Sequence, residues 1–211
     1  MTPPDPVSLS RSRSWTLRLT NLDFFVLANL ILFLLMCVFS YYDRFVQYRG
    51  AANVFEFLIY ALVIILASVF LWSYFRGYTF DSRLLALIQV GILMHYAGAF
   101  VQIGGARLYD NALLGLRFDK VVHFSNALII AVLVGRLFQI RRMPLDFVNT
   151  VLIVVTVLGL GAIIEVVEYA VCLTVPGSGV GGYDNNLQDL IANLAGGMTS
   201  LALQHQLARR R

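Results

Sequence analysis

The chain has 211 residues, of which 59% are hydrophobic and 13% are charged, and its mean hydropathy is +0.75. This composition excludes an ordinary water-soluble domain, in which about 25% of the residues are charged. The net charge is +4 at pH 7. Six membrane-spanning helices of about 20 residues each, with short loops, would use nearly the whole length, so no room is left for a separate soluble catalytic domain.

The first 22 residues have no apolar core, and most of their proline, serine and arginine falls before Trp15. We expect them to form a disordered cytoplasmic tail. The apolar run that begins at Asp23 is longer than the apolar part of a signal peptide and ends in Tyr41 and Tyr42. It is therefore expected to remain in the protein as the first span.

Six apolar runs are long enough to cross roughly 30 Å of hydrocarbon. They lie at about 23–42, 53–75, 84–104, 119–140, 148–174 and 187–206. The predicted fold class is all-α, a polytopic bundle of transmembrane helices with six spans. The membrane domain is predicted to cover 23–206, and a basic cytoplasmic tail to cover 207–211.

Basic residues indicate the orientation, because lysine and arginine are enriched in short cytoplasmic segments. One side of the predicted membrane carries eleven basic residues: Arg11, Arg13, Arg18, Arg76, Arg83, Arg136, Arg141, Arg142, Arg209, Arg210 and Arg211. The other side carries five: Arg44, Arg49, Arg107, Arg117 and Lys120. Both termini are therefore predicted to be cytoplasmic, in a multi-pass protein of the inner (plasma) membrane. The loops 43–52, 105–118 and 175–186 are predicted to face outward.

Polar residues recur at helical spacing in the last four predicted spans. The four sets are Gly91, His95, Gly98 and Gln102; Asp119, His123 and Asn126; Gly161, Glu165 and Glu168; and Asp189, Asn193, Gly196 and Ser200, after Asp184 and Asn185. Residues three and four apart share one face of a helix. Each ionisable group at the bilayer centre costs about 2.5–3.5 kcal/mol on insertion scales, so each requires a partner, a cavity or a function.

The predicted topology places all four sets in the outer leaflet, because odd spans run outward and even spans run inward. Asp43 and Glu56 are expected at the same level, and Arg117 and Lys120 add positive charge. We therefore predict a polar pocket that opens to the extracytoplasmic side. Its glycines would allow the helices to approach closely.

Two kinds of chemistry fit this pocket. His95, His123, Glu165, Glu168 and Asp189 could hold one divalent cation, either magnesium, calcium or manganese through the oxygen ligands or zinc through the histidines. Equally, the histidines and carboxylates could transfer protons without a metal. The sequence contains no G-x-S-x-G, no HExxH and no phosphate-binding glycine loop.

Three short motifs carry a family resemblance: FDKVVHF at 118–124, ExxE at 165–168 and DNNLQDLIANLAGG at 184–197. In this order and spacing, the chain resembles the VanZ-like membrane proteins and the YjdF-like inner-membrane family of unknown function. MHYAGA at 94–99 and GLRFDKVVHF at 115–124 are more similar to the YjdF-like group. The resemblance covers roughly residues 84–200.

The resemblance implies a small polytopic protein of the cell envelope, since the VanZ-like group is linked to glycopeptide (teicoplanin) resistance. The positions that it marks are Asp119, Lys120, His123, Glu165, Asp189 and Asn193. The chain departs from the pattern at Tyr183-Asp184, where a tryptophan is expected beside the aspartate, and at Val166, where glutamine or tryptophan is expected. Because of these two departures, the resemblance does not imply that the chain shares a substrate with either group.

The leading hypothesis is that the outer-leaflet pocket binds, and transforms if it is catalytic, the head group of a lipid or lipid-linked envelope precursor. The candidate catalytic residues are His123 as base or ligand, Asp119 as its orienting partner, and Glu165 and Asp189. The candidate substrate-binding residues are Arg117, Lys120, Asp184 and Asn193. A metal-dependent membrane-embedded hydrolase or transferase is one form of this hypothesis.

Two alternatives from other classes stay open at this point. In a proton- or ion-coupled transporter the same carboxylates would relay protons or ions. In an accessory subunit of a larger membrane complex, the polar cluster would only join the helices to one another. The expected partners are membrane lipids, together with either a second copy of the chain or a larger membrane complex, and not nucleic acid.

Overall fold

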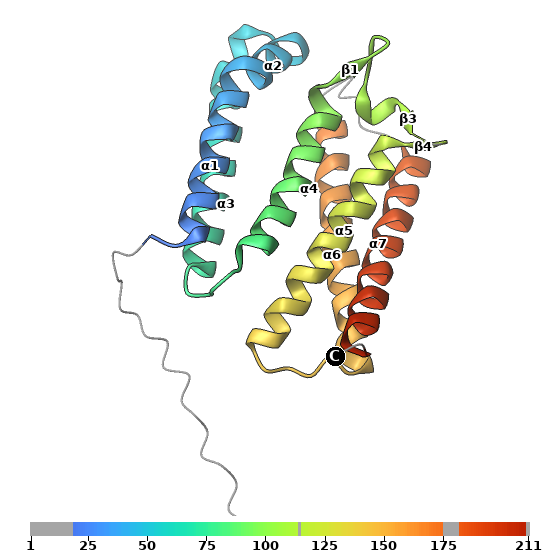
Figure 1. The fold of residues 1–211 in the computed structure, drawn as a ribbon. Coiled ribbons are helices and arrows are strands. Elements are labelled where there is room, and N and C mark those ends of the chain that lie inside the picture. Colours follow the sequence, from blue (N-terminus) through green and yellow to red (C-terminus); the bar gives the residue numbers. More distant parts are fainter. Residues whose placement is uncertain (1–18, 114, 175–181, 210–211) are drawn as a thin grey trace, which may run out of the picture.

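The computed structural model describes residues 19–113, 115–174 and 182–209, and it confirms the all-α fold class. The long helices are α1 (Asn21–Met36), α3 (Val54–Phe75), α4 (Ser82–Phe100), α5 (Phe118–Ile140), α6 (Phe147–Thr174) and α7 (Tyr183–Arg209). Helices α1 and α3 lie side by side, and α4 to α7 are grouped beside them (Figure 1). The predicted disordered tail over 1–22 falls largely outside the described residues, and so does most of the predicted loop 175–186.

Among the described residues, five helical segments are long and apolar enough to cross a membrane. They are Asn21–Gln47, Ala51–Phe75, Ser82–Phe100, Phe118–Ile140 and Phe147–Ala170. Helix α7 has 27 residues, but its first half carries two aspartates and several amides, which lower its hydropathy. The chain is thus a multi-pass membrane protein, and a sixth crossing by α7 stays a prediction.

Helices α1 and α3 form a hairpin held together at one end by Asp23. Its carboxylate accepts hydrogen bonds from the Trp72 indole (2.7 Å) and the Arg76 guanidinium (3.1 Å). Thr20 caps α1, because its hydroxyl accepts from the Asp23 backbone N–H. A π-helical turn, Cys37–Tyr41, leads directly into α2 (Tyr42–Arg49), so the first predicted span continues into a helix that extends the hairpin.

The hairpin touches the rest of the bundle mainly through α4. The amides of Asn29 and Gln89 exchange two hydrogen bonds, of 2.8 and 3.2 Å, and Tyr41 packs edge-on against Phe100. Not one residue of α3 is buried. The hairpin therefore presents most of its apolar surface outward, as expected for helices that face lipid.

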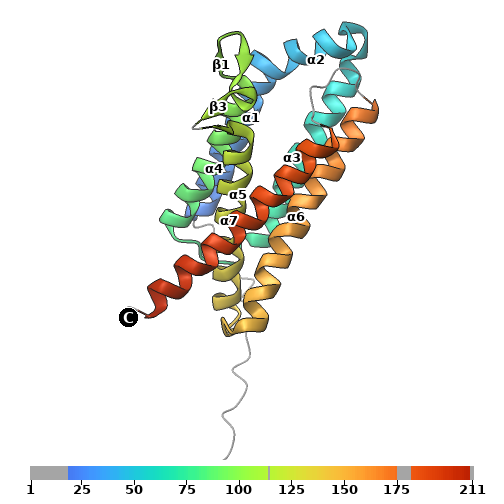
Figure 2. The ribbon, with the colours of Figure 1, turned by 90° about the vertical axis from the view of Figure 1, so that its right-hand side faces the viewer.

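The interior of the bundle lies among α5, α6 and α7. Ala127 and Ala131 of α5 pack against Ile153 and Val157 of α6, and all four side chains are buried. At Gly196 of α7, a Cβ atom would collide with the backbone carbonyl of Phe124. The absence of a side chain at this glycine lets α7 lie directly on α5, and Figure 2 shows α7 crossing the bundle obliquely.

Two small hairpins replace the end of the predicted third span. Helix α4 ends at Phe100, and the strands β1 (Gln102–Ile103), β2 (Ala106–Arg107), β3 (Ala112–Leu113) and β4 (Leu116–Arg117) follow. Gly104 and Gly105 form the first turn with positive φ angles of 62° and 82°, which glycine adopts readily. Gln102, predicted on the polar face of that span, therefore lies in a strand and not on the helix that carries His95.

Candidate functional site

A cavity of about 280 Å³ lies at the end of the α4–α7 bundle that carries the small hairpins. This is the end predicted to face outward. Its walls are mostly apolar, and its polar residues come from α2, α4, α5, α6, α7 and the hairpins. They are Arg44, His95, Arg107, Tyr109, Asp110, Arg117, Asp119, His123, Asn126, Glu168, Asn185 and Asn193.

Lys120, the only lysine of the chain, lies beside this cavity and is 8% exposed. Its ammonium is 2.6 Å from Asp189 Oδ1 and 3.0 Å from Asp119 Oδ2. It also donates to the side-chain oxygen of Asn185 at 2.9 Å. With the backbone carbonyl of Asn185 at 3.2 Å, four oxygens from two helices surround the ammonium, and Asp189, at 1% exposure, has a charged partner inside the protein.

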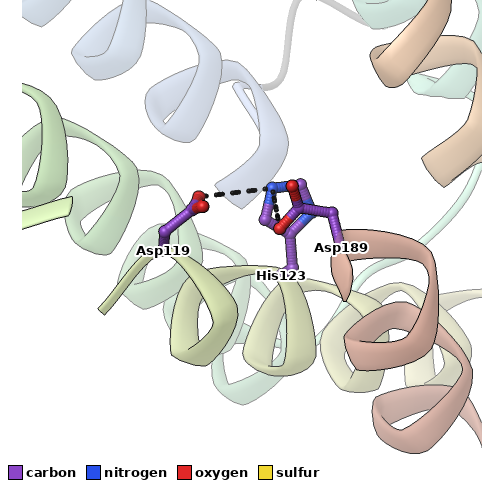
Figure 3. Close-up of side chains that lie close together, drawn as sticks. All are labelled: Asp119, His123 and Asp189. Atoms are coloured by element: carbon purple, nitrogen blue, oxygen red, sulfur yellow. Dashed lines mark ion pairs between the residues drawn. The ribbon is translucent and has the colours of Figure 1, made fainter. Parts of the chain in front are cut away.

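His123 lies one turn after Asp119 on α5 and faces the same two aspartates (Figure 3). Its Nε2 atom is 3.4 Å from Asp189 Oδ1 and 3.6 Å from Asp119 Oδ1. Its Nδ1 atom is 4.0 Å from Glu165 Oε1. The imidazole is thus flanked by carboxylates on both ring nitrogens, an arrangement in which histidine can accept and return a proton.

Arginines from the hairpins lie above this cluster. Asp110 accepts from Arg107 Nε at 2.8 Å and from Arg117 Nη2 at 3.0 Å. Arg117 Nη1 also donates to Asn185 Oδ1 at 3.0 Å, the oxygen that Lys120 contacts. Asp110 thus accepts from two guanidinium groups, and Arg44 is the third arginine among the residues that line the cavity.

Three glycines on the helix faces leave room for polar side chains of the site. A Cβ atom at each would collide with the side chain opposite: Gly91 with Asn126, Gly98 with Tyr109, and Gly161 with Asn193. These glycines therefore position side chains as well as allowing helices to pack closely.

His95, on α4, forms a separate pair with Tyr109. Its Nδ1 atom is 2.6 Å from the hydroxyl of Tyr109, which follows strand β2. Burial raises the pKa of the Tyr109 hydroxyl above its ordinary value, and the nearby carboxylates of Asp119 and Glu168 raise it further. The hydroxyl therefore keeps its proton, and the tautomer of His95 decides which of the two groups donates in this hydrogen bond.

The predicted metal ligands are only partly brought together. Among the described residues, Asp119, His123 and Asp189 place one ligand atom each within 4.8 Å of the others. His95, Glu165 and Glu168 lie outside this group, because His95 bonds Tyr109 and the two glutamates project from α6. The Lys120 ammonium already contacts both aspartates of the group, so a cationic partner for them is part of the chain itself.

The other predicted residues divide clearly. Glu168, Arg117 and Asn193 line the cavity, and Glu165 lies behind His123. Asp184 is exposed in the first turn of α7 and does not line the cavity. Glu56, expected at the same level, pairs with Arg49 at 2.8 Å outside it.

Sequence reasoning missed Arg44, Arg107 and Tyr109 as site residues. They lie in α2 and in the hairpin segment, where no helical period of the polar sets reaches them. The sequence feature that could have identified Arg44 and Arg107 is their position in segments predicted to face outward, where basic residues are few. Tyr109 left no comparable signal.

The sequence model of a family described as predicted membrane protein, DUF2238, matches residues 24–210 of the chain. The chain belongs to DUF2238. The matched segment includes α2 to α7 and nearly all of α1. It therefore contains every residue of the candidate site described above. The description of DUF2238 names a membrane protein and mentions neither the VanZ-like nor the YjdF-like group. No curated protein and no solved structure matches the chain.

Proposed function

We propose that this protein binds the anionic head group of a membrane lipid, or of a lipid-linked envelope precursor, in the cavity of the α4–α7 bundle. The observation that carries the proposal is the presence of three arginines, Arg44, Arg107 and Arg117, among the residues that line this cavity. Guanidinium groups bind phosphate oxygens in pairs of charge-assisted hydrogen bonds.

The predicted orientation supports this assignment. Basic residues are disfavoured in short segments outside the membrane. Of the five that are predicted there, Arg44, Arg107 and Arg117 line the cavity and Lys120 lies directly beside it. A negatively charged ligand would account for the presence of these four basic residues at the cavity. The resemblance to the VanZ-like group indicates that this ligand belongs to the cell envelope.

The cluster beneath the arginines is suited to proton transfer on the bound head group. Asp119 and Asp189 both lie near Nε2 of His123, and Glu165 lies near Nδ1. These carboxylates can orient the imidazole ring and stabilise its charged form. In this proposal His123 is the acid–base group of a hydrolase or transferase reaction.

A transporter is supported less well. Immediately inward of the polar cluster, Ala127, Ala131, Ile153 and Val157 close the space between α5 and α6, and none is more than 2% exposed. A proton or ion pathway requires polar groups or water through this layer.

The test measures binding of phosphatidic acid, whose head group is a bare phosphate, to the detergent-purified protein by native mass spectrometry. Arg117→Gln and Arg44→Gln are each expected to weaken binding by about tenfold, since one hydrogen bond to a charged group contributes about 1.5–3 kcal/mol. Arg136→Gln, at the opposite end of α5, is the matched control and should bind as the unmodified protein does. Equal affinity in all three variants would refute the proposal.

A further inference from the structure

Two buried polar atoms beside the cavity have no hydrogen-bond partner among the described residues: Glu165 Oε1 and Asn193 Nδ2. The two residues are only 6% and 5% exposed. Buried polar atoms are nearly always paired, since an unpaired one loses its hydrogen bonds to water without replacement. One of these atoms is an acceptor and the other is a donor.

Gly161 of α6 relates the positions of the two residues. Asn193 Nδ2 occupies the space that a Cβ atom of Gly161 would fill, and Glu165 follows Gly161 by one helical turn on α6. Residues so spaced are about 5–6 Å apart on the helix surface. Gly161, Asn193 and His123 all line the cavity, and Glu165 Oε1 is 4.0 Å from His123 Nδ1, too long for a hydrogen bond.

The chemistry of these atoms discriminates among ligands. A hydroxyl both donates and accepts, so it can donate to Glu165 and accept from Asn193. An ammonium only donates and would leave Asn193 Nδ2 unpaired. A phosphate oxygen only accepts, and the Glu165 carboxylate repels it.

We infer that the ligand is a phosphorylated polyol or sugar, with its phosphate at the arginines and a hydroxyl between Glu165 and Asn193. This inference rests on the proposed function and specifies its substrate class. Glu168, on the same face of α6, provides a second acceptor for a neighbouring hydroxyl. The volume of about 280 Å³ is at the lower limit of ligand pockets, about 300–1,000 Å³, and suits a glycerol or a single sugar ring rather than an oligosaccharide.

The experiment compares three lipids with the same acyl chains by native mass spectrometry of the detergent-purified full chain. Phosphatidylglycerol carries two hydroxyls beside its phosphate, phosphatidic acid carries none, and phosphatidylethanolamine carries an ammonium. Phosphatidylglycerol is expected to bind at least about tenfold more tightly than either of the others. Addition of glycerol 1-phosphate distinguishes the source of the ligand, since competition indicates a soluble ligand and its absence indicates a lipid.

Glu165→Met and Asn193→Leu are the test variants, because each new side chain is close in size to the original and can exchange no hydrogen bond with a hydroxyl. Each is expected to abolish the preference for phosphatidylglycerol over phosphatidic acid, measured as the ratio of the two affinities in the same variant. Thr156→Val, an exposed position on α6, is the control and should keep the preference. Monodispersity and the midpoint of thermal unfolding establish that each variant is folded.

The outcomes separate the two proposals. If phosphatidic acid binds in an arginine-dependent manner but phosphatidylglycerol has no advantage, or keeps its advantage in both test variants, the hydroxyl inference is overturned and the anion site stands. If no anionic lipid binds the unmodified protein, the proposed function itself fails.

Discussion

Lys120 is the residue on which the integrity of the site depends most directly. It is buried, and its ammonium lies against Asp119 and Asp189. Exchanging a buried ion pair for apolar residues changes stability little, whereas removal of one partner leaves an uncompensated charge. The aspartates thus require the lysine as much as the lysine requires them.

Lys120→Met is expected to lower the free energy of unfolding by about 3–5 kcal/mol, because Asp189 would remain buried without its cation. The measurement is the unfolding midpoint in detergent. The double variant Lys120→Met with Asp189→Leu should recover most of the loss, whereas Arg136→Ala, an exposed basic position, should change little. A single variant as stable as the unmodified chain would contradict the ion pair.

Helical spacing in the sequence was sufficient to place Asp119 and His123 on one face of a helix, and Asp189 and Asn193 on another. Spacing did not reveal the contact between Lys120 and Asp189, because periodicity fixes the face of a helix and not the partner that it meets. Tyr109 was out of reach for another reason. It lies in a short irregular segment, where no repeat relates it to His95.

At the scale of single elements, the contact between α5 and α7 determines whether the site forms. The two helices supply Asp119, Lys120 and His123 on one side and Asp189 and Asn193 on the other. Gly196 determines the distance between the two helices, because the backbone carbonyl of Phe124 occupies the space that a side chain at Gly196 would fill.

Gly196→Val is expected to destabilise the protein by about 1–3 kcal/mol or more, since backbone cannot move aside as a flexible side chain can. It should also weaken binding of phosphatidic acid, because α7 would shift relative to α5. Gly159→Val is the matched control: a Cβ atom there meets nothing within 4 Å. Similar losses in both variants would show that helix propensity, and not the close contact, is responsible.

The ends of the elements show what hydropathy can and cannot predict. Helices α3, α5 and α6 begin and end within one residue of the predicted ranges, because loss of hydrophobicity coincides with their ends. The third range was too long by four residues, since Val101 and Ile103 are apolar but lie in extended backbone. A window of hydropathy measures only composition, so it cannot separate an apolar strand from the last turn of a helix.

At the scale of the whole molecule, the bundle has two unequal parts. Helices α4 to α7 enclose the cavity, and the α1–α3 hairpin contributes Arg44 at its edge (Figure 1). The orientation of both parts in the membrane is a prediction from the distribution of basic residues. The packing of the helices against one another does not depend on which end of the bundle faces the cytoplasm.

The topology is tested by labelling single cysteines with a membrane-impermeant maleimide, in a chain whose Cys37 and Cys172 have been replaced. Leu116→Cys is expected to react in intact cells, and Met143→Cys only after lysis; both positions are exposed. Gln206→Cys, exposed near the end of α7, should behave like Met143→Cys if α7 crosses the membrane. Labelling of Gln206→Cys in intact cells would reduce the number of spans to five.

The polarity of α7 also gives the assembly an order in time. The ribosome makes α7 after α5, so Lys120 has already been synthesised when Asp189 appears. Asp189 alone would be costly in lipid, but it can enter as one half of a neutral pair with Lys120.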